Sequence, residues 1–125
     1  MLKSEKSMSV ASEKLAEAQA LLKSGFESSA VVSAYASMFH AGRALLFKDG
    51  IIEKSHYCLI EYLRETYVKT GKMPAEAITV MDAFREERHE VMYSLEGIKI
   101  KQKVAQTAID NAKALIDAVK PMLKP

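Results

Sequence analysis

The stretch around which the chain is organised is residues 84–95, which read Phe84-Arg85-Glu86-Glu87-Arg88-His89-Glu90-Val91-Met92-Tyr93-Ser94-Leu95. At about 100° per residue, its apolar side chains and Met81 fall within roughly one third of a helix circumference. Arg88 falls at the middle of that arc, and Arg85, His89 and Tyr93 follow one another at a spacing of four along its edge. The pattern predicts the second half of a long amphipathic helix, with a polar cluster beside its apolar face.

Arg88 has two interpretations. In the first, its aliphatic stem packs beside Phe84 and Val91 while the guanidinium reaches the edge of the core or pairs internally. In the second, the loss of several kcal/mol of hydration on burying an unpaired cation favours a partner or a task for Arg88. Physical chemistry alone leaves both open.

Length and composition favour one globular domain over residues 1–125, with 27% charged and 49% hydrophobic residues. No apolar run is long enough to span a membrane and the N-terminus is polar, so we expect a cytoplasmic protein without membrane contact. The single Cys58 cannot form an internal disulfide. A net charge of +2 does not by itself indicate a nucleic-acid binder, so any RNA contact would be local.

Apolar residues at spacings of three and four predict five helices, at about residues 4–24, 28–49, 55–71, 74–95 and 101–122. Ser28 or Ser29 is the expected N-cap of the second helix and Ser55 that of the third. Gly25, Gly50 and Gly71 are the expected C-terminal stops. No segment alternates as a β-strand does. The expected fold is all-α, an antiparallel up-and-down four-helix bundle with an additional helix.

The second helix differs from the others because residues 30–47 contain no acidic residue and many small ones. Small side chains let neighbouring backbones approach closely, so this segment should be the central helix. Its expected core face consists of Val31, Tyr35, Met38, Leu45 and Leu46. His40 and Arg43 lie roughly opposite, between Ala36 and Phe47, which suggests a subunit contact or a groove.

Motifs of most enzyme classes are absent: there is no Gly-rich phosphate loop, zinc helix, Cys-x-x-Cys pair or nucleophile elbow. The three histidines fall on three different helices, and no metal site or cofactor is expected. His56 can be an ordinary first-turn residue. Asp82, Glu86 and Glu90 have the pattern of a solvated face.

Several motifs, taken together in this order, give the chain a resemblance to a family. They are an Arg-rich fourth helix preceded by Ala34-Tyr35-Ala36-Ser37-Met38-Phe39-His40-Ala41-Gly42-Arg43-Ala44-Leu45-Leu46, Lys54-Ser55-His56 and Tyr67-Val68-Lys69-Thr70-Gly71-Lys72. Over about residues 5–123 the chain resembles the small stand-alone HEPN-domain proteins of bacteria and archaea. The resemblance implies a HEPN four-helix bundle with an added helix, usually a homodimer. Many members are metal-independent RNases or toxin components paired with a minimal nucleotidyltransferase, and others only bind.

The catalytic pattern of the active branch is Arg, a polar residue, several spacers and then His. Arg88 matches the Arg and His89 the polar residue, but Tyr93 stands where the His belongs. Metal-free RNA cleavage needs a base that works near neutral pH, and a tyrosine, with a reference pKa of about 10, is a poor one. Arg88 can still bind phosphate, with Tyr93 contacting a base.

Three hypotheses follow. The first is a dimeric module that binds RNA or a nucleotide, or a partner such as a minimal nucleotidyltransferase in a toxin–antitoxin-like pair, with little or no catalysis. The second is a metal-independent RNase that uses Arg88 with His89 or Tyr93. The third is a purely structural interaction bundle. Beyond these catalytic candidates, the candidate ligand-binding residues are Arg85, His40, Arg43 and His56.

Overall fold

The computed structural model describes residues 2–52, 55–93 and 102–124, and the side chains of all of these except 86–93. The described residues form helices and no strand. The elements are α1 (Lys3–Lys23), α2 (Glu27–Asp49), α3 (His56–Leu63), the π-helical turn η1 (Arg64–Val68), α4 (Ala75–Tyr93) and α5 (Gln102–Met122). The predicted all-α class is confirmed.

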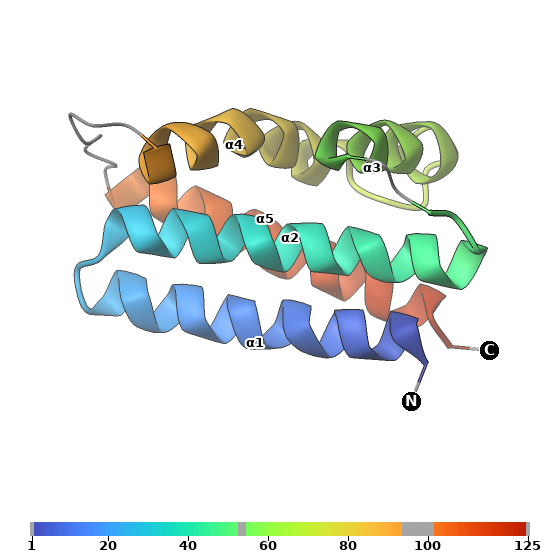
Figure 1. Ribbon diagram of the computed structural model, residues 1–125, viewed down its shortest axis with the longest axis horizontal. Helices are drawn as coiled ribbons and strands as arrows, with labels where there is room; N and C mark the ends of the chain where they lie inside the picture. Colours follow the sequence, from blue (N-terminus) through green and yellow to red (C-terminus); the bar gives the residue numbers. More distant parts are fainter. Residues whose placement is uncertain (1, 53–54, 94–101, 125) are drawn as a thin grey trace.

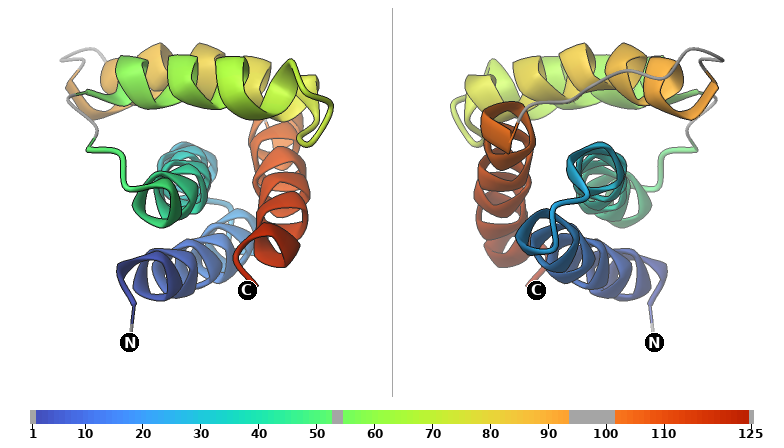
Figure 2. Two further views of the ribbon diagram at one scale, coloured as in Figure 1. Left: turned by 90° about the vertical axis from the view of Figure 1, so that its right-hand side faces the viewer. Right: turned by 90° about the vertical axis from the view of Figure 1, so that its left-hand side faces the viewer.

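The four long helices alternate in direction. In Figure 1, α1 and α4 run from right to left and α2 and α5 from left to right, while α3 and η1 lie in the link between α2 and α4. Figure 2 shows α2 nearly end-on between α1, α5 and the layer of α3 and α4, and that layer crosses α2 obliquely. Because α2 contacts α1, α3, α4 and α5, it is the central helix, as predicted, and α4 lies in an outer layer.

Glycine turns end three of the helical segments. At Gly25, φ is 85°, the Gly25 N–H donates to the Leu22 carbonyl, and the Phe26 N–H donates to the Leu21 carbonyl at 2.9 Å. This is a Schellman motif, in which only glycine adopts the left-handed conformation without strain. The same pattern follows α2 at Gly50 and η1 at Gly71.

The N-caps agree with the sequence at one of two positions. The Ser55 hydroxyl accepts the Cys58 N–H at 3.1 Å and begins α3 as predicted. The predicted cap at Ser28 or Ser29 is wrong, because α2 already begins at Glu27, after Phe26. Phe26, which follows the Schellman turn at Gly25, occupies the N-cap position of α2 and makes no side-chain capping bond.

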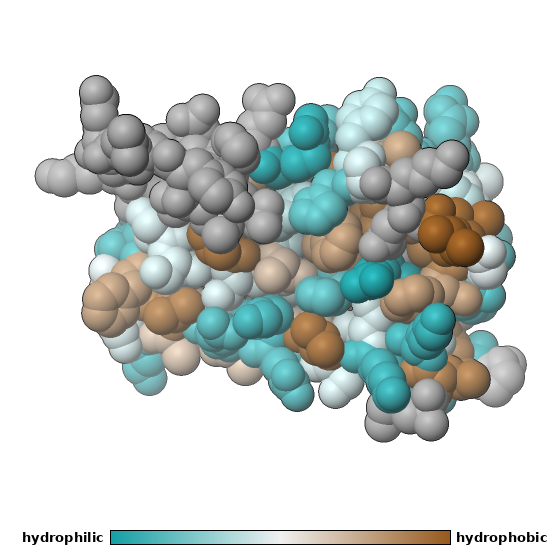
Figure 3. Space-filling model, viewed as in Figure 1, coloured by the Kyte–Doolittle hydropathy of each residue, from teal (hydrophilic) through white to brown (hydrophobic). Residues whose placement is uncertain are grey.

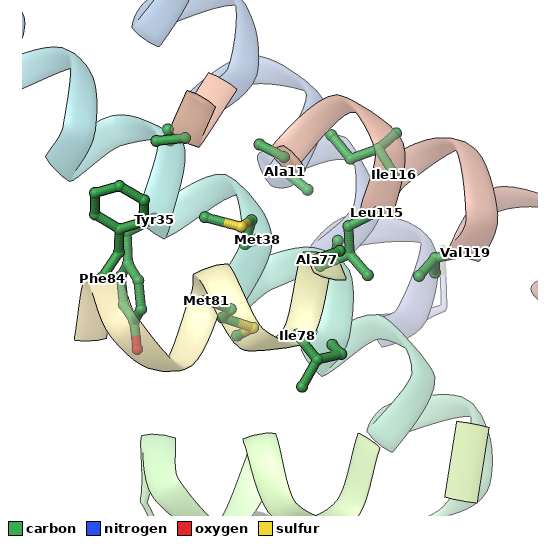
Figure 4. Packing of buried hydrophobic residues seen from close by; sticks show 14 of the residues in the cluster. Ala11, Tyr35, Met38, Ala77, Ile78, Met81, Phe84, Leu115, Ile116 and Val119 are labelled. Carbon is green, nitrogen blue, oxygen red and sulfur yellow. The ribbon is translucent and has the colours of Figure 1, made fainter. Parts of the chain in front are cut away.

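The core lies between α2 and its neighbours. Figure 4 shows Tyr35 and Met38 of α2 facing Met81 and Phe84 of α4, with Leu115, Ile116 and Val119 of α5 closing the layer. All five residues of the predicted core face of α2 are buried, and so are Met81 and Phe84. The side chains of Val91 and Met92 of the same predicted stripe, and the whole of Leu95, lie outside the described part of the structure.

Two serine hydroxyls connect α1 to α2. Ser7 donates to the His40 carbonyl at 2.7 Å, and the fully buried Ser37 donates to the Ala11 carbonyl at 2.7 Å. Each bond contributes about 0.5–1.5 kcal/mol net. Together they fix the register in which the two helices pair.

Ionisable groups connect η1 to its neighbours. Asp49, at the end of α2, accepts the hydroxyls of Tyr62 at 2.8 Å and Tyr67 at 2.5 Å. Asp82 of α4 pairs with Arg64 at 3.7 Å and Arg85 at 3.3 Å. Asp82 was predicted to belong to a solvated face; its side chain is partly exposed, at 36%, but it is also paired, because η1 packs beside α4 and supplies the cation Arg64.

Hydropathy sets one further bound on the fold. Among the described helices, none is both long and apolar enough to cross a membrane.

Candidate functional site

One stripe of α2 is not fully covered by other helices. Between residues 30 and 47, every side chain of α2 is buried except a row at helical spacing, Val32, Ala36, Phe39, His40, Arg43 and Phe47, which is half-buried. In Figure 3, polar and apolar side chains lie side by side over α1 and α2. The stripe therefore divides into an apolar half, Val32 to Phe39, and a half that begins at His40 and contains a cation.

A groove runs between the second half of this stripe and the start of α1. Its first hollow, of about 380 Å³, is lined by Lys3, Lys6, Ser7, Val10, His40, Arg43 and Phe47. A second hollow of about 430 Å³ shares Lys3, Arg43 and Phe47 and ends at Gly50, Ile51 and Ile52. We call the two hollows together the α1–α2 groove.

The α1–α2 groove is positively charged. Lys3, Lys6 and Arg43 line it, and none of the described lining residues is acidic. The Arg43 guanidinium lies 5.0 Å from the centre of the Phe47 ring, and the Lys3 ammonium lies 5.8 Å from it. Both distances fit cation–π contacts, which hold the two cations at one aromatic ring.

His40 also lines the first hollow, where its surroundings favour the neutral imidazole. Burial lowers the pKa of His40 below its ordinary value of 6.5, and the nearby charges of Arg43 and Lys14 lower it further. An anion beside the ring would oppose all three effects by favouring the imidazolium. His40 can therefore add a fourth positive charge to the groove when an anion is bound.

His56 lies in a separate aromatic cluster. Its Nδ1 is 2.8 Å from the hydroxyl of Tyr35, which is 1% exposed, and the Phe39 ring centre is 4.1 Å from that of the His56 ring. Phe39 also meets the His40 ring edge-on at 5.6 Å. The structure thus connects the two histidines through Phe39 but does not bring His56 into the α1–α2 groove.

Arg85 lies apart from both the α1–α2 groove and the aromatic cluster of His56. It pairs with Asp82, and its guanidinium lies 5.9 Å from the Tyr57 ring centre. It does not line the groove. Of the predicted ligand-binding residues, the structure brings only His40 and Arg43 into one hollow. The predicted catalytic residues Arg88, His89 and Tyr93 belong to α4, but their side chains lie outside the described residues.

Two cations of the groove, Lys3 and Lys6, were missed by sequence reasoning, which treated them as the polar start of the first helix. A signal was present. Because α1 and α2 pair antiparallel across the tight turn at Gly25, a residue near the start of α1 must lie near the end of α2. Lys3 therefore had to lie close to Phe47.

The groove offers the chemistry of anion binding. Arginine and lysine neutralise phosphate, and aromatic rings stack with bases. Across the part of the chain that the structure describes, no three His, Cys, Asp or Glu side chains gather as potential metal ligands.

Comparison with known proteins agrees with the all-helical fold. Among curated proteins, none matches the chain. The family model of the HEPN domain matches residues 4–122, nearly the whole chain and all five helices of the bundle. The chain belongs to the HEPN domain family, whose domains are known as nucleotide- and RNA-binding modules.

Proposed function

We propose that this HEPN domain binds RNA or a nucleotide in the α1–α2 groove and has little or no catalytic activity. The supporting observation is that Lys3, Lys6 and Arg43 line one hollow, with Lys3 and Arg43 at the Phe47 ring. A cationic hollow without acidic lining attracts a phosphate group, because opposite charges attract strongly where the site is partly shielded from water. The aromatic ring adds a surface on which a base can stack.

Because the overall charge of the chain is nearly balanced, the concentration of cations at the groove is a stronger indication of anion binding. The chain has a net charge of only +2, so it does not attract nucleic acid over its whole surface. Three cations at one groove form a local positive potential instead, which steers a polyanion to that place. Arg43 is half-buried and rises from the central helix, so its position is well fixed.

Binding is tested with a fluorescently labelled single-stranded RNA whose anisotropy is followed at several salt concentrations. The affinity should fall as salt rises, because the bound strand releases counterions. Arg43→Gln should abolish most of the binding. The exposed Lys3→Gln and Lys6→Gln should each reduce the slope of log affinity against log salt by about one. Lys113→Gln, an exposed lysine of α5, is the matched control and should change nothing.

Catalysis is tested with the same RNA in EDTA. The wild type should leave the strand intact, because Tyr93 replaces the expected base. Tyr93→His should raise any residual cleavage. Robust EDTA-resistant cleavage by the wild type that disappears in Arg88→Met would contradict the proposal in favour of a metal-independent RNase.

The apolar half of the α2 stripe supports a homodimer. Val32, Ala36 and Phe39 are half-buried in the single chain, and a second copy can complete their burial without bringing the cations of two grooves together. Ala36→Glu should dissociate such a dimer in sedimentation at micromolar concentration, whereas Phe47→Glu should have a smaller effect. A wild-type monomer would contradict this arrangement.

A partner protein is the other part of the proposal. The resemblance to HEPN proteins that pair with a minimal nucleotidyltransferase supports such a partner. Purification of the chain from its native cells, followed by mass spectrometry of the protein and nucleic acid bound to it, tests both partner classes. A nucleotidyltransferase in the complex is the expected result.

A further inference from the structure

Three residues divide the α1–α2 groove into two compartments. Lys3, Phe47 and Arg43 line both hollows, and both cations contact the Phe47 ring. We call this set the Lys3–Phe47–Arg43 bridge. The groove thus has positive charge at its middle and separate space on either side.

The register of α1 against α2 fixes the order of the parts. The Ser7 hydroxyl bonded to the His40 carbonyl holds the first hollow at one side of the bridge. The chain after α2 holds the second hollow at the other side, where Gly50 turns the backbone with φ of 73°. From His40 to Gly50 the helix rises about 15 Å, so the two hollows lie in sequence along one line.

Each hollow is suited to a flat, weakly polar group. Val10 and the flat imidazole of His40 line the first, beside Lys6. Ile51 and Ile52 line the second, and Ile52 is 89% exposed while Ile51 is 39% exposed. Volumes of about 380 and 430 Å³ lie at the lower end of the range of roughly 300–1,000 Å³ for small-molecule sites, so each hollow takes one group rather than two.

We propose that the groove binds a dinucleoside unit of a nucleic-acid single strand, with the linking phosphodiester at the Lys3–Phe47–Arg43 bridge and one nucleoside in each hollow. This assignment rests on the proposed function and narrows its ligand class to a strand rather than a mononucleotide. A mononucleotide fills one hollow only and leaves the apolar lining of the other, either Val10 or Ile51 and Ile52, in water. A strand covers them, which removes apolar surface from solvent in addition to neutralising the cations.

The probes are small enough to isolate one phosphate. Adenylyl-3′,5′-adenosine has one negative charge flanked by two nucleosides, and AMP has about two negative charges and one nucleoside. If charge alone decided, AMP would bind more tightly. We expect the dinucleoside to bind the full-length chain at least about tenfold more tightly in isothermal titration, a difference of about 1.4 kcal/mol. The deoxy analogue tests whether the 2′-hydroxyl contributes to recognition, since only that group differs.

Variants test the position of the second nucleoside. The double variant Ile51→Ser and Ile52→Ser should weaken dinucleoside binding about tenfold, because its second base loses apolar contact. Phe26→Ser is the matched control: Phe26 is 59% exposed but lies at the opposite end of α2. Arg43→Gln should remove binding, and the exposed Lys3→Gln serves the same purpose should Arg43→Gln fail to fold.

The outcomes separate the two proposals. If AMP binds as tightly as the dinucleoside, or the isoleucine double variant binds like the wild type, the dinucleoside assignment is wrong while nucleotide binding in the groove stands. If neither probe nor a longer single strand shows saturable binding that depends on Lys3 and Arg43, both proposals are wrong.

Discussion

The two sides of α2 are held to their neighbours by different kinds of contact. On the α1 side, serine hydroxyls of Ser7 and Ser37 donate to backbone carbonyls, and both bonds join uncharged groups. On the other side, Asp49 of α2 accepts the hydroxyls of Tyr62 and Tyr67. Within the outer layer, Asp82 of α4 pairs with Arg64 and Arg85. The stability of the packing between α1 and α2, which form the groove, should therefore depend little on pH and salt. The stability of the outer layer of α3, η1 and α4 should depend on both.

The largest expected effect concerns the close contact between α2 and α3. Leu63 is fully buried, and Leu63→Ala should lower the free energy of unfolding by about 2–5 kcal/mol. A methyl group on Gly42 would lie 2.7 Å from Leu63 Cδ1, so Gly42→Ala should destabilise by about 1–3 kcal/mol. In the Leu63→Ala background the closest clash is gone and only the tight contact with Leu59 Cδ2 at 3.1 Å remains, so Gly42→Ala should destabilise by less than it does in the wild type, helped by its better helix propensity.

Urea unfolding of the four proteins of this double-mutant cycle measures the coupling. Additive effects of the two substitutions would show that Gly42 is not required by the packing of Leu63.

The second prediction concerns the bond between η1 and α2. Tyr67→Phe removes a hydroxyl bonded to the Asp49 carboxylate and should lower the free energy of unfolding by about 1.5–3 kcal/mol. Burial, followed by the hydrogen bond to Asp49 and its charge, raises the pKa of Tyr67 well above its ordinary value. The wild type should therefore lose stability as pH rises above the unfolded value of about 10, where only the unfolded chain releases the proton.

Tyr67→Phe should lack part of this alkaline slope in thermal unfolding followed from neutral pH to about pH 11. Tyr62→Phe is the control with the same chemistry. The Tyr62 ring is only partly buried, and its pKa is raised mainly by burial and then by Asp49. Tyr62→Phe should therefore lower the free energy of unfolding by less than Tyr67→Phe does. Equal alkaline slopes in wild type and Tyr67→Phe would contradict the argument.

A weaker effect is expected at Asp82. Its side chain is 36% exposed, so Asp82→Asn should destabilise by no more than about 1 kcal/mol. The difference should shrink in 0.5 M salt, where the Debye length falls to roughly 4 Å. Glu17→Gln breaks an exposed pair within α1 and should change stability by less than about 0.5 kcal/mol. A loss at Asp82 that is unaffected by salt would indicate that packing, not charge, holds η1 to α4.

The smallest effect on stability is expected on the α1 side, at His40. The folded chain has the lower pKa there, so stability should be complete above the unfolded value of about 6.5 and decline as pH falls below it. His40→Gln should flatten this acid slope. The sign reverses for ligand binding, because a phosphate favours the imidazolium. RNA affinity should therefore rise severalfold from about pH 8 to pH 6 in the wild type and less in His40→Gln.

Most of the fold could be predicted because the signals for where a helix begins and ends lie in its own sequence. Periodicity and the three glycine turns fixed the helix ends to within a few residues, and the small residues of residues 30–47 identified the central helix. The π-helical turn could not be predicted, because a shift from α to π hydrogen bonding at Arg64–Val68 leaves no pattern in the side chains. Nor could the start of α2, which depends on backbone bonds at Gly25.

Fewer residues of the candidate site than of the fold could be predicted from the sequence. His40 and Arg43 stood out because polar groups on a helix without acidic residues are unexpected. Lys3 and Lys6 did not, because a lysine in a first turn is ordinary until the partner helix is known. His56 and Arg85 were grouped with them by residue type, but they are used in contacts with Tyr35 and with Asp82. Chemistry alone does not show which side chains share a hollow.

The π-helical turn has a consequence for how this chain can evolve. In η1 the Lys69 N–H reaches back to the Arg64 carbonyl, five residues earlier, so the turn contains one residue more than an α-helical turn would. Loss of one residue there converts the turn to an ordinary α-helix and leaves α3 and the Gly71 turn in register. The same deletion within α2 would rotate everything beyond it by about 100° against four neighbouring helices. Differences in length among HEPN relatives should therefore collect at residues 64–68 and be absent from the central helix.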